Sequence, residues 1–383
     1  MCFIISKLNT GKRIIDVFVF SCYIVFKPST ELFESGMSMD QKLTIKNIAD
    51  EIGVSTATVS RVLNGKKGYS EETKRRIEEL INKTGYSPNP QAKALRKNFS
   101  NIVGIIVPTI RYEGYAMVAS AIQRQLMERG FIVVICDAQN DASLCAKHVE
   151  MLRAQMACGL ILVSISSLDE QHLKGIPVVS VGNRFLSGDL DQMRIEVLSD
   201  SFREGYMAAE ELLSQGARHL LAVTSSLGRS SFEERFHGFS HRLKLFNDRE
   251  TNKAEARLVT LEASETSLYS EVQDSFSKLF QDRYPFDGIL FSNDSLAFPS
   301  INVILSHGYK IPADIKIVSR GNILIARHGQ VRLTSICPDV QGISKCAADV
   351  LVRMMSGEEI ENRTILFTSK LIPRESTRGK DEV

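Results

Sequence analysis

The stretch VSTATVSRVLNGKKGYS, residues 54–70, decides the fold, although its composition is unusual for a helix. Its first half is rich in Ser, Thr and Val, which form helices poorly in isolation. A single arginine, Arg61, stands at the far end of that half. We expect a short helix that Ser55 caps and that tertiary packing stabilises. Its buried face is expected to consist of apolar residues at helical spacing: Val59, Val62 and Leu63.

The sequences on either side predict two further helices. LTIKNIADEIG, residues 43–53, has an apolar stripe at helical spacing, with Thr44 as N-cap and Gly53 as the stop. Ser70 is expected to cap a third helix, which carries two glutamates in its first turn, where the helix dipole favours acidic side chains. Two short helices joined by a tight turn, with a third as a brace, form a helix-turn-helix unit.

The small residues of the middle helix suit a helix that lies in the major groove of DNA. The groove is about 12 Å wide, and bulky side chains would hold the helix away from the base edges. Small hydroxyl and methyl groups allow close approach, whereas Arg61 is long enough to reach guanine O6 and N7. An ordinary helical bundle is the alternative. The candidate DNA-contacting residues of this region are Thr44, Ser55, Thr56, Ala57, Thr58, Ser60, Arg61 and Asn64.

The charge distribution points to the same partner. The whole chain has a net charge of +2, but residues 40–100 carry 12 basic and 7 acidic side chains, which gives +5. Residues 1–39 carry +1, so residues 101–383 carry −4. A basic head on a mildly acidic body indicates that the head meets a polyanion and that the body does not. A solvated, charge-rich surface is the alternative interpretation.

The cysteines and the first residues bear on the compartment. The seven cysteines form no CxxC pair and stand mostly in apolar runs, which is typical of a reducing cytoplasm and not of a zinc site. The apolar run at residues 14–26 contains Asp16, is shorter than a membrane span and is followed by no signal-peptidase motif. We therefore interpret residues 1–42 as an extension that arises from a misassigned start codon, with Met37 or Met39 as the true start; export is the alternative.

The remainder of the chain alternates apolar runs with segments of helix or loop length. The runs are IVGIIVP, FIVVICD, GLILVS, IPVVSVG, HLLAVTS and DGILFS. Near-continuous apolar strands that alternate with helices predict parallel sheets covered on both faces. About 280 residues favour two such lobes over one.

The segment from residue 43 to residue 98 resembles the DNA-binding head of the LacI/GalR-type bacterial transcription regulators. The resemblance rests on LTIKNIADEIGVSTATVSRVLNGKKGYSEETKRRIEELINKTGYSPNPQAKALRKN and continues more loosely through VGIIVP, REGYMAAEELLSQGARHLLAV, ERFHGF, DGILFSNDSLA, GYKIPADIKIV, LTSI and IPREST. It implies an all-α helix-turn-helix head and an α/β body of two doubly wound parallel-sheet lobes of periplasmic-binding-protein type. It divides the chain into a head at 43–86, a hinge at 87–100 and a body at 101–383.

The resemblance also implies a function and a set of contacts. The protein would bind a pseudo-palindromic operator as a homodimer or tetramer, as a repressor whose DNA affinity a small effector modulates. Thr56, Ala57 and Arg61 match the base-reading positions. The hinge residues that the resemblance assigns to DNA are Asn89, Gln91, Ala92, Lys93 and Leu95. The leucine pair of a dimer would insert into the minor groove; a leucine that packs inside a linker helix is the alternative.

The effector cleft departs from the family pattern more than the head does. The family has Phe-Phe where Gly114 and Tyr115 stand, and a sugar-binding acidic residue where Gly321 stands. Three interpretations are open: a ligand other than a free sugar, with arginines that point to an anion; no ligand, or a co-regulator protein instead; and a carbohydrate that stacks on tyrosine. The candidate effector-binding residues are Tyr112, Tyr115, Asp200, Arg235, Asn293, Asp294 and Arg320. An inter-lobe salt bridge is the alternative role for Arg235.

An enzyme and an exported solute-binding protein are the alternative functions. No GxSxG, P-loop or HExxH motif is present, and His237 and His241, at ligand spacing, have no evident third ligand, so the sequence predicts neither an enzyme nor a metal or cofactor. An exported solute-binding protein would share the body, but a DNA-binding head has no use outside the cell. The sequence therefore favours a cytoplasmic regulator with no membrane partner.

Overall fold

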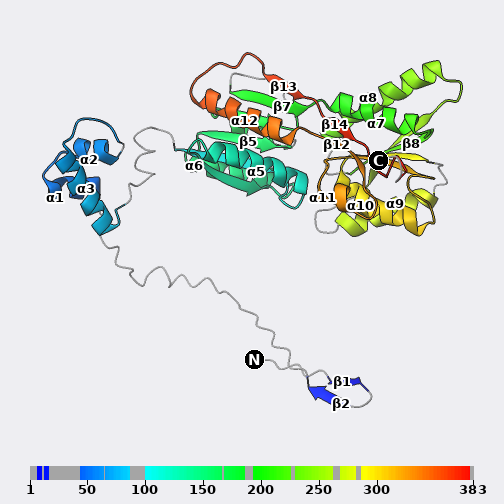
Figure 1. The fold of residues 1–383 in the computed structure, drawn as a ribbon, viewed down its shortest axis with the longest axis horizontal. Helices are drawn as coiled ribbons and strands as arrows, with labels where there is room; N and C mark the ends of the chain where they lie inside the picture. Colours follow the sequence, from blue (N-terminus) through cyan, green and yellow to red (C-terminus); the bar gives the residue numbers. More distant parts are fainter. Residues whose placement is uncertain are drawn as a thin grey trace. The chain divides into compact units, whose positions relative to one another are not determined.

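A computed structural model describes the chain in segments: residues 7–10, 13–16, 44–63, 65–86, 100–165, 168–185, 193–225, 229–261, 268–281 and 286–379. These segments belong to two units, Met1–Pro88 and Asn89–Val383 (Figure 1). In the first unit, strands β1 (Lys7–Thr10) and β2 (Arg13–Asp16) pair antiparallel, which the sequence did not predict. The other residues of the 1–42 extension lie outside the described segments.

Three helices form the helix-turn-helix: α1 (Ile45–Ile52), α2 (Thr56–Leu63) and α3 (Glu71–Thr84). The predicted caps are confirmed, because the Thr44 and Ser70 hydroxyls each accept a hydrogen bond from a backbone N–H in the first turn of the following helix. Gly53 ends α1 in the left-handed conformation (φ 75°), which glycine adopts without strain. The core of this unit consists of Ile48, Ala49, Ile52, Val59 and Ile77.

The body begins with an entirely parallel six-stranded sheet, the N-terminal lobe. In spatial order, its strands are β13 (Thr364–Phe367), β7 (Arg194–Ser199), β6 (Val178–Val181), β5 (Gly159–Val163), β3 (Ile102–Val107) and β4 (Ile132–Asp137). Helices α5 (Glu113–Met127) and α12 (Val340–Met355) share a core with one face, and α6 (Ala142–Ala154) shares a core with the other. A short 3₁₀ helix, η2 (Glu170–Leu173), precedes β6.

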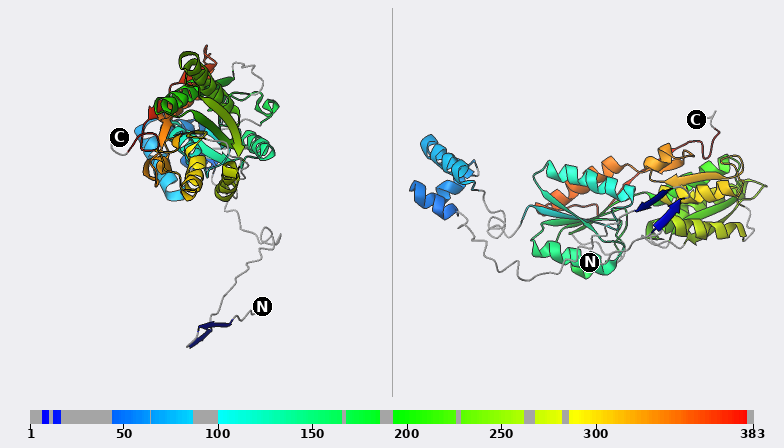
Figure 2. Two further views of the ribbon diagram at one scale, coloured as in Figure 1. Left: turned by 90° about the vertical axis from the view of Figure 1, so that its right-hand side faces the viewer. Right: turned by 90° about the horizontal axis from the view of Figure 1, so that it is seen from below.

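The C-terminal lobe repeats this arrangement. In spatial order, its strands are β14 (Lys370–Ile372), β12 (Thr334–Cys337), β11 (Lys316–Arg320), β10 (Gly288–Phe291), β8 (His219–Ser225) and β9 (Glu255–Leu261); β14 is antiparallel to β12 and the other pairings are parallel. Helices α7 (Ser201–Ser214) and α8 (Arg229–Arg249) share a core with one face. Helices α9 (Leu268–Gln281), α10 (Asp294–Ser306) and α11 (Leu324–His328) contribute to the core on the other face (Figure 2). The predicted fold class is confirmed.

The described chain passes between the lobes at three places: from β7 to α7, from β12 to α12 and from β13 to β14. Two of these crossovers are joined directly, because the backbone N–H of Asp200 donates to the carbonyl of Phe367 at 2.9 Å. Side chains next to these crossovers can therefore contact both lobes. None of the described helices combines the length and the apolar character needed to cross a bilayer.

Helices α7 and α8 cross with their backbones in contact, which only glycine allows. A Cβ atom on Gly205 would lie 1.7 Å from the carbonyl oxygen of Arg235, and one on Gly238 would lie 1.8 Å from the carbonyl oxygen of Phe202. The glycines therefore bring the two helices to a closer approach than any larger side chain permits. This crossing places Glu204 of α7 beside Arg235 of α8.

Candidate functional site

The N-terminal end of α2 presents the small side chains that the sequence assigned to DNA. The Ser55 hydroxyl accepts a hydrogen bond from the Thr58 backbone N–H at 3.1 Å, so Ser55 caps the helix as predicted. The Ser55 and Thr58 hydroxyls are 2.9 Å apart. Thr56 and Ala57 are exposed beside them. This end of α2 therefore offers hydroxyl and methyl groups that do not obstruct close contact with another molecule.

The rest of α2 is anchored by the core. Val59 has no exposed surface, and Val62 and Leu63 pack partly buried against the same cluster. Arg61 points outward and is exposed; its side chain passes near Gly68, where an added Cβ would lie 3.8 Å from the Arg61 Cδ and Nη1 atoms. The weak intrinsic helix propensity of α2 is thus offset by packing on one face, and the other face remains available.

The remaining predicted DNA contacts are only partly described. Thr44 forms a capping box with Asn47, in which the Thr44 backbone N–H donates to Asn47 Oδ1 at 2.9 Å. Ser60 is half-buried on α2. The predictions for Asn64 and for the hinge residues Asn89, Gln91, Ala92, Lys93 and Leu95 fall outside the described segments and stay predictions.

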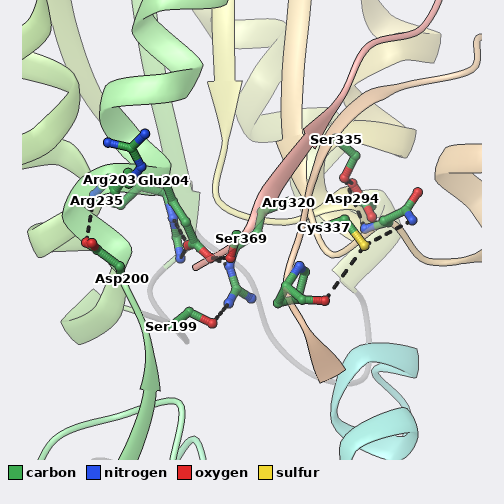
Figure 3. A network of polar contacts seen from close by, with 12 residues as sticks. Ser199, Asp200, Arg203, Glu204, Arg235, Asp294, Arg320, Ser335, Cys337 and Ser369 are labelled. Atoms are coloured by element: carbon green, nitrogen blue, oxygen red, sulfur yellow. Dashed lines mark hydrogen bonds and ion pairs between the residues drawn. The ribbon is translucent and has the colours of Figure 1, made fainter. Parts of the chain in front are cut away.

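In the body, a buried glutamate that the sequence did not single out organises the polar contacts near the crossovers. Glu204 has no exposed surface. Its Oε2 atom accepts hydrogen bonds from Arg235 Nε at 3.0 Å and Nη2 at 2.8 Å, and from Arg320 Nε at 2.9 Å (Figure 3). Its Oε1 atom accepts from the Ser369 hydroxyl at 2.6 Å, which lies in the crossover between β13 and β14.

In this cluster, ion pairing opposes the effect of burial on the charged groups. Burial alone would raise the pKa of Glu204, but the charges of Arg320 and Arg235 and their hydrogen bonds lower it to about 2. Burial lowers the pKa of Arg235 against the opposing effect of Glu204. For Arg320, Glu204 outweighs burial and raises the pKa. Both arginines predicted to meet an effector are therefore engaged by one internal carboxylate.

The Asn-Asp pair at the start of α10 is also engaged internally. Asn293 caps the helix, because its Oδ1 atom accepts from the Leu296 backbone N–H at 3.0 Å. Asp294 is fully buried and accepts hydrogen bonds from the Ser335 hydroxyl at 2.9 Å, from the Ile323 backbone N–H at 3.0 Å and from the Ser319 hydroxyl. Burial raises the pKa of Asp294 in spite of these bonds. The carboxylate thus holds α10, β11 and β12 together.

Asp200 has a comparable structural position at the first crossover. Its carboxylate accepts a hydrogen bond from the Arg203 backbone N–H at 2.9 Å, so Asp200 is the N-cap of α7 (Figure 3). Arg320 reaches the end of β7, where its Nη2 atom donates to the Ser199 hydroxyl at 3.3 Å. A side chain of the C-terminal lobe is thereby bonded to the last residue of β7 in the N-terminal lobe.

The two tyrosines come from the other lobe. Tyr112 and Tyr115, at the start of α5, meet edge to face with their ring centroids 4.7 Å apart. The Tyr112 hydroxyl approaches Gly321, where an added Cβ would lie 3.2 Å from it and 3.0 Å from Asp294 Oδ2. Burial, followed by the negative charge of Asp294, raises the pKa of Tyr112. The structure therefore brings Tyr112, Asp294 and Arg320 into one electrostatic environment.

The effector roles predicted for these residues stay predictions, but the structure shows their present partners. The alternative role for Arg235, a salt bridge between the lobes, takes a different form: its partner Glu204 lies on the neighbouring helix of the same lobe. One sequence signal could have identified Glu204. It immediately precedes Gly205 in REGYMAAEELL, and the charge of an acidic residue on the buried side of a helix requires a basic partner.

Comparison with known protein families covers both units. The profile described as "Bacterial regulatory proteins, lacI family" matches residues 44–89, and that described as "Periplasmic binding protein-like domain" matches residues 209–377. The first match begins at Thr44, the N-cap of α1, and includes all three helices of the head.

Curated relatives match nearly the whole chain. It is 25% identical over 345 residues to the HTH-type transcriptional repressor PurR of Mannheimia succiniciproducens, a match that covers 88% of this chain and 98% of the relative. The protein of the same name from Edwardsiella ictaluri is 26% identical over 339 residues, with 87% and 96% covered. These relatives are transcriptional repressors and not enzymes.

Solved structures confirm the fold. The lac repressor dimer bound to operator and the anti-inducer ONPF superposes with a TM-score of 0.75 at 20% identity, covering 88% of this chain and 99% of that one. The transcriptional regulator CelR in complex with cellobiose gives a TM-score of 0.63 at 23% identity, with 87% and 99% covered. The family predicted from the sequence is confirmed, and the matched DNA-binding head argues against an exported solute-binding protein. This chain therefore carries a LacI-family DNA-binding head and a periplasmic-binding-protein-like body, and it is similar over most of its length to HTH-type transcriptional repressors.

Proposed function

We propose that the protein represses transcription in the cytoplasm by binding a pseudo-palindromic operator as a homodimer. The observation that carries this proposal is the exposed, small-residue end of α2 on a helix whose opposite face is fixed by Val59. A helix of this kind can enter the major groove, with Thr56 and Ala57 against base edges and Arg61 in reach of a guanine. The repressor function of the relatives, which match most of this chain, supports the same role.

Exposed apolar side chains at equivalent edges of the two sheets support the homodimer. β4 ends the sheet of the N-terminal lobe and β9 ends the sheet of the C-terminal lobe, each next to the first strand of its lobe. Ile132 and Ile135 on β4 are 50% and 37% exposed, and Leu258 on β9 is 42% exposed. Uncovered apolar edge strands favour association. A twofold-related second copy would cover both edges with one self-complementary surface.

The inter-lobe region is the proposed regulatory part of the body. Arg320 of the C-terminal lobe is bonded to Ser199 of the N-terminal lobe, and Glu204 is bonded to Ser369 in a crossover, so a change in lobe arrangement has to break or rebuild these contacts. Among the relatives in solved structures, CelR is in complex with cellobiose and the lac repressor with an anti-inducer. A small molecule that favours one lobe arrangement would change operator affinity through the hinge at 87–100.

The base-reading role of Arg61 provides the test. The operator is first selected from random duplexes with the full chain, and binding is then measured for the wild type and Arg61→Ala. We expect the substitution to weaken operator binding by about 1–3 kcal/mol and to relax specificity at one base pair in each half-site. Arg75→Ala is the matched control, because Arg75 on α3 is 70% exposed and forms an ion pair with Glu79, which is 65% exposed. Equal losses on operator and random DNA would contradict the proposed role of Arg61.

A further inference from the structure

Two glycines make room for the same tyrosine side chain. One is Gly114, where a Cβ would lie 2.7 Å from Tyr112 Cε1. The other is Gly321; its φ of +127° favours glycine, and a Cβ there would lie 3.2 Å from the Tyr112 hydroxyl. Larger residues at either position would displace the ring, so the two glycines and Tyr112 fit together as a set.

The neighbouring residue fastens this contact between the lobes. Glu113 opens α5 in the N-terminal lobe, and its Oε1 atom accepts a hydrogen bond from the Leu324 backbone N–H at 3.0 Å, at the start of α11 in the C-terminal lobe. A carboxylate that accepts from a backbone N–H at a helix start gains from both the hydrogen bond and the helix dipole. Tyr112 and Glu113 thus lie against Gly321 and Leu324, which are three residues apart in the C-terminal lobe.

The groups that would hold a ligand between the lobes already have partners in the chain. Asp294 accepts three hydrogen bonds, and Arg235 and Arg320 share the Glu204 carboxylate. A ligand that binds these groups has to break internal bonds in a buried environment, where a group that is left unpaired is costly. A side chain tethered in place competes at a high effective concentration. Both effects disfavour a small molecule at this position.

We propose that Tyr112 is a built-in substitute for an effector: together with Glu113 it holds the lobes in their DNA-binding arrangement, so operator binding requires no small molecule. This inference rests on the proposed repressor function. By this inference the protein binds its operator constitutively, and its own residues close the cleft between the lobes. A compound that enters the cleft has to displace the Tyr112 ring and release Glu113 from Leu324. Such a compound weakens operator binding.

The test uses the full chain, as the wild type and as four variants. Glu113→Ala removes the acceptor of the Leu324 amide, whereas Glu113→Gln keeps an acceptor oxygen. Tyr112→Ala removes the ring. Glu128→Ala, at the exposed end of α5, is the control. Hydrogen exchange of the Leu324 amide reports the contact between the lobes, and operator affinity reports the function, with and without glucose, ribose 5-phosphate, inorganic phosphate and adenine.

In the wild type and in Glu128→Ala without ligand, we expect the Leu324 amide to be protected from exchange. The two proteins should bind the operator with the same affinity. None of the four compounds should increase that affinity. We expect Glu113→Ala to lose the protection and Glu113→Gln to retain part of it. Glu113→Ala and Tyr112→Ala should each weaken operator binding by about tenfold, within the usual range of coupling between sites. The proposal is overturned if the Leu324 amide exchanges equally fast in the wild type and Glu113→Ala, or if one of the compounds strengthens wild-type operator binding. If neither the wild type nor any variant prefers one duplex over another, the proposed repressor function is wrong. Exchange of the Leu324 amide then still tests whether Glu113 holds the two lobes together.

Discussion

Replacing Glu204 by glutamine tests the physical account of the body in one step. The wild-type carboxylate is fully buried and forms ion pairs with two arginines. Its pKa falls from the ordinary value of 4.5 to about 2 in the folded protein. Because each pKa unit corresponds to about 1.4 kcal/mol, the ionised carboxylate stabilises the fold by about 3 kcal/mol at neutral pH. Removal of one partner of a buried ion pair typically costs about 3–5 kcal/mol, which agrees with this figure.

Urea unfolding of the full chain, followed by circular dichroism, is a suitable assay because the chain contains no tryptophan. At pH 7 we expect Glu204→Gln to lower the free energy of unfolding of the body by about 3 kcal/mol, which moves the urea midpoint down by about 1 M for a slope of about 3 kcal/mol per M. Glu210→Gln is the matched control on the same helix, since Glu210 is 55% exposed and its pair with Arg242 spans 3.6 Å. We expect that control to cost no more than about 1 kcal/mol.

The sign of the pH dependence follows from the lowered pKa of Glu204. The folded state holds the carboxylate ionised more strongly than the unfolded state does, so its contribution is present above pH 4.5 and declines as the pH falls towards 2. We therefore expect the stability difference between the wild type and Glu204→Gln to shrink over that range. A variant within 1 kcal/mol of the wild type at pH 7, or a difference that is independent of pH, would refute the reasoning.

Three further predictions concern other parts of the chain. Gly205→Ala should destabilise the body by at least about 3 kcal/mol in the same urea assay, because its Cβ would lie 1.7 Å from the Arg235 carbonyl oxygen, whereas Gly379→Ala, which meets nothing within 4 Å, should have little effect. Thr44→Ala removes the α1 cap and should cost the head about 1 kcal/mol, measured as faster amide exchange in α1; unchanged exchange would contradict the capping assignment. Ile132→Glu places a charge on the exposed β4 edge and should convert the dimer to monomer in analytical ultracentrifugation; a dimer of unchanged stability would remove β4 from the proposed interface.

The sequence predicted the elements whose local signals agree with their tertiary setting. The three helices of the head have caps and apolar stripes that follow the helical period, and the apolar runs became central strands such as β3, β5 and β8. Strand β9 escaped prediction because, at the sheet edge, its sequence EARLVTL mixes polar with apolar residues and forms no long apolar run.

The candidate site was predicted less completely than the fold, for a physical reason. Family resemblance identified Arg235 and Asp294, but their partners depend on how distant segments meet. Glu204 reaches Arg235 only because two glycines let α7 and α8 touch, and it reaches Arg320 across 116 residues of sequence. No local pattern encodes such a meeting. The same holds for Tyr112 and Gly321, whose contact joins two lobes.

The central claim, that two α2 helices of a dimer read an operator, is tested most directly by selecting bound sequences from a random duplex library. The selection uses the full chain at moderate salt and no added ligand. The account predicts enrichment of an inverted repeat whose half-sites are spaced for two α2 helices on one face of the DNA, about one helical turn apart. Recovery of sequences without a shared motif, or of a single half-site bound by one copy of the chain, would contradict it.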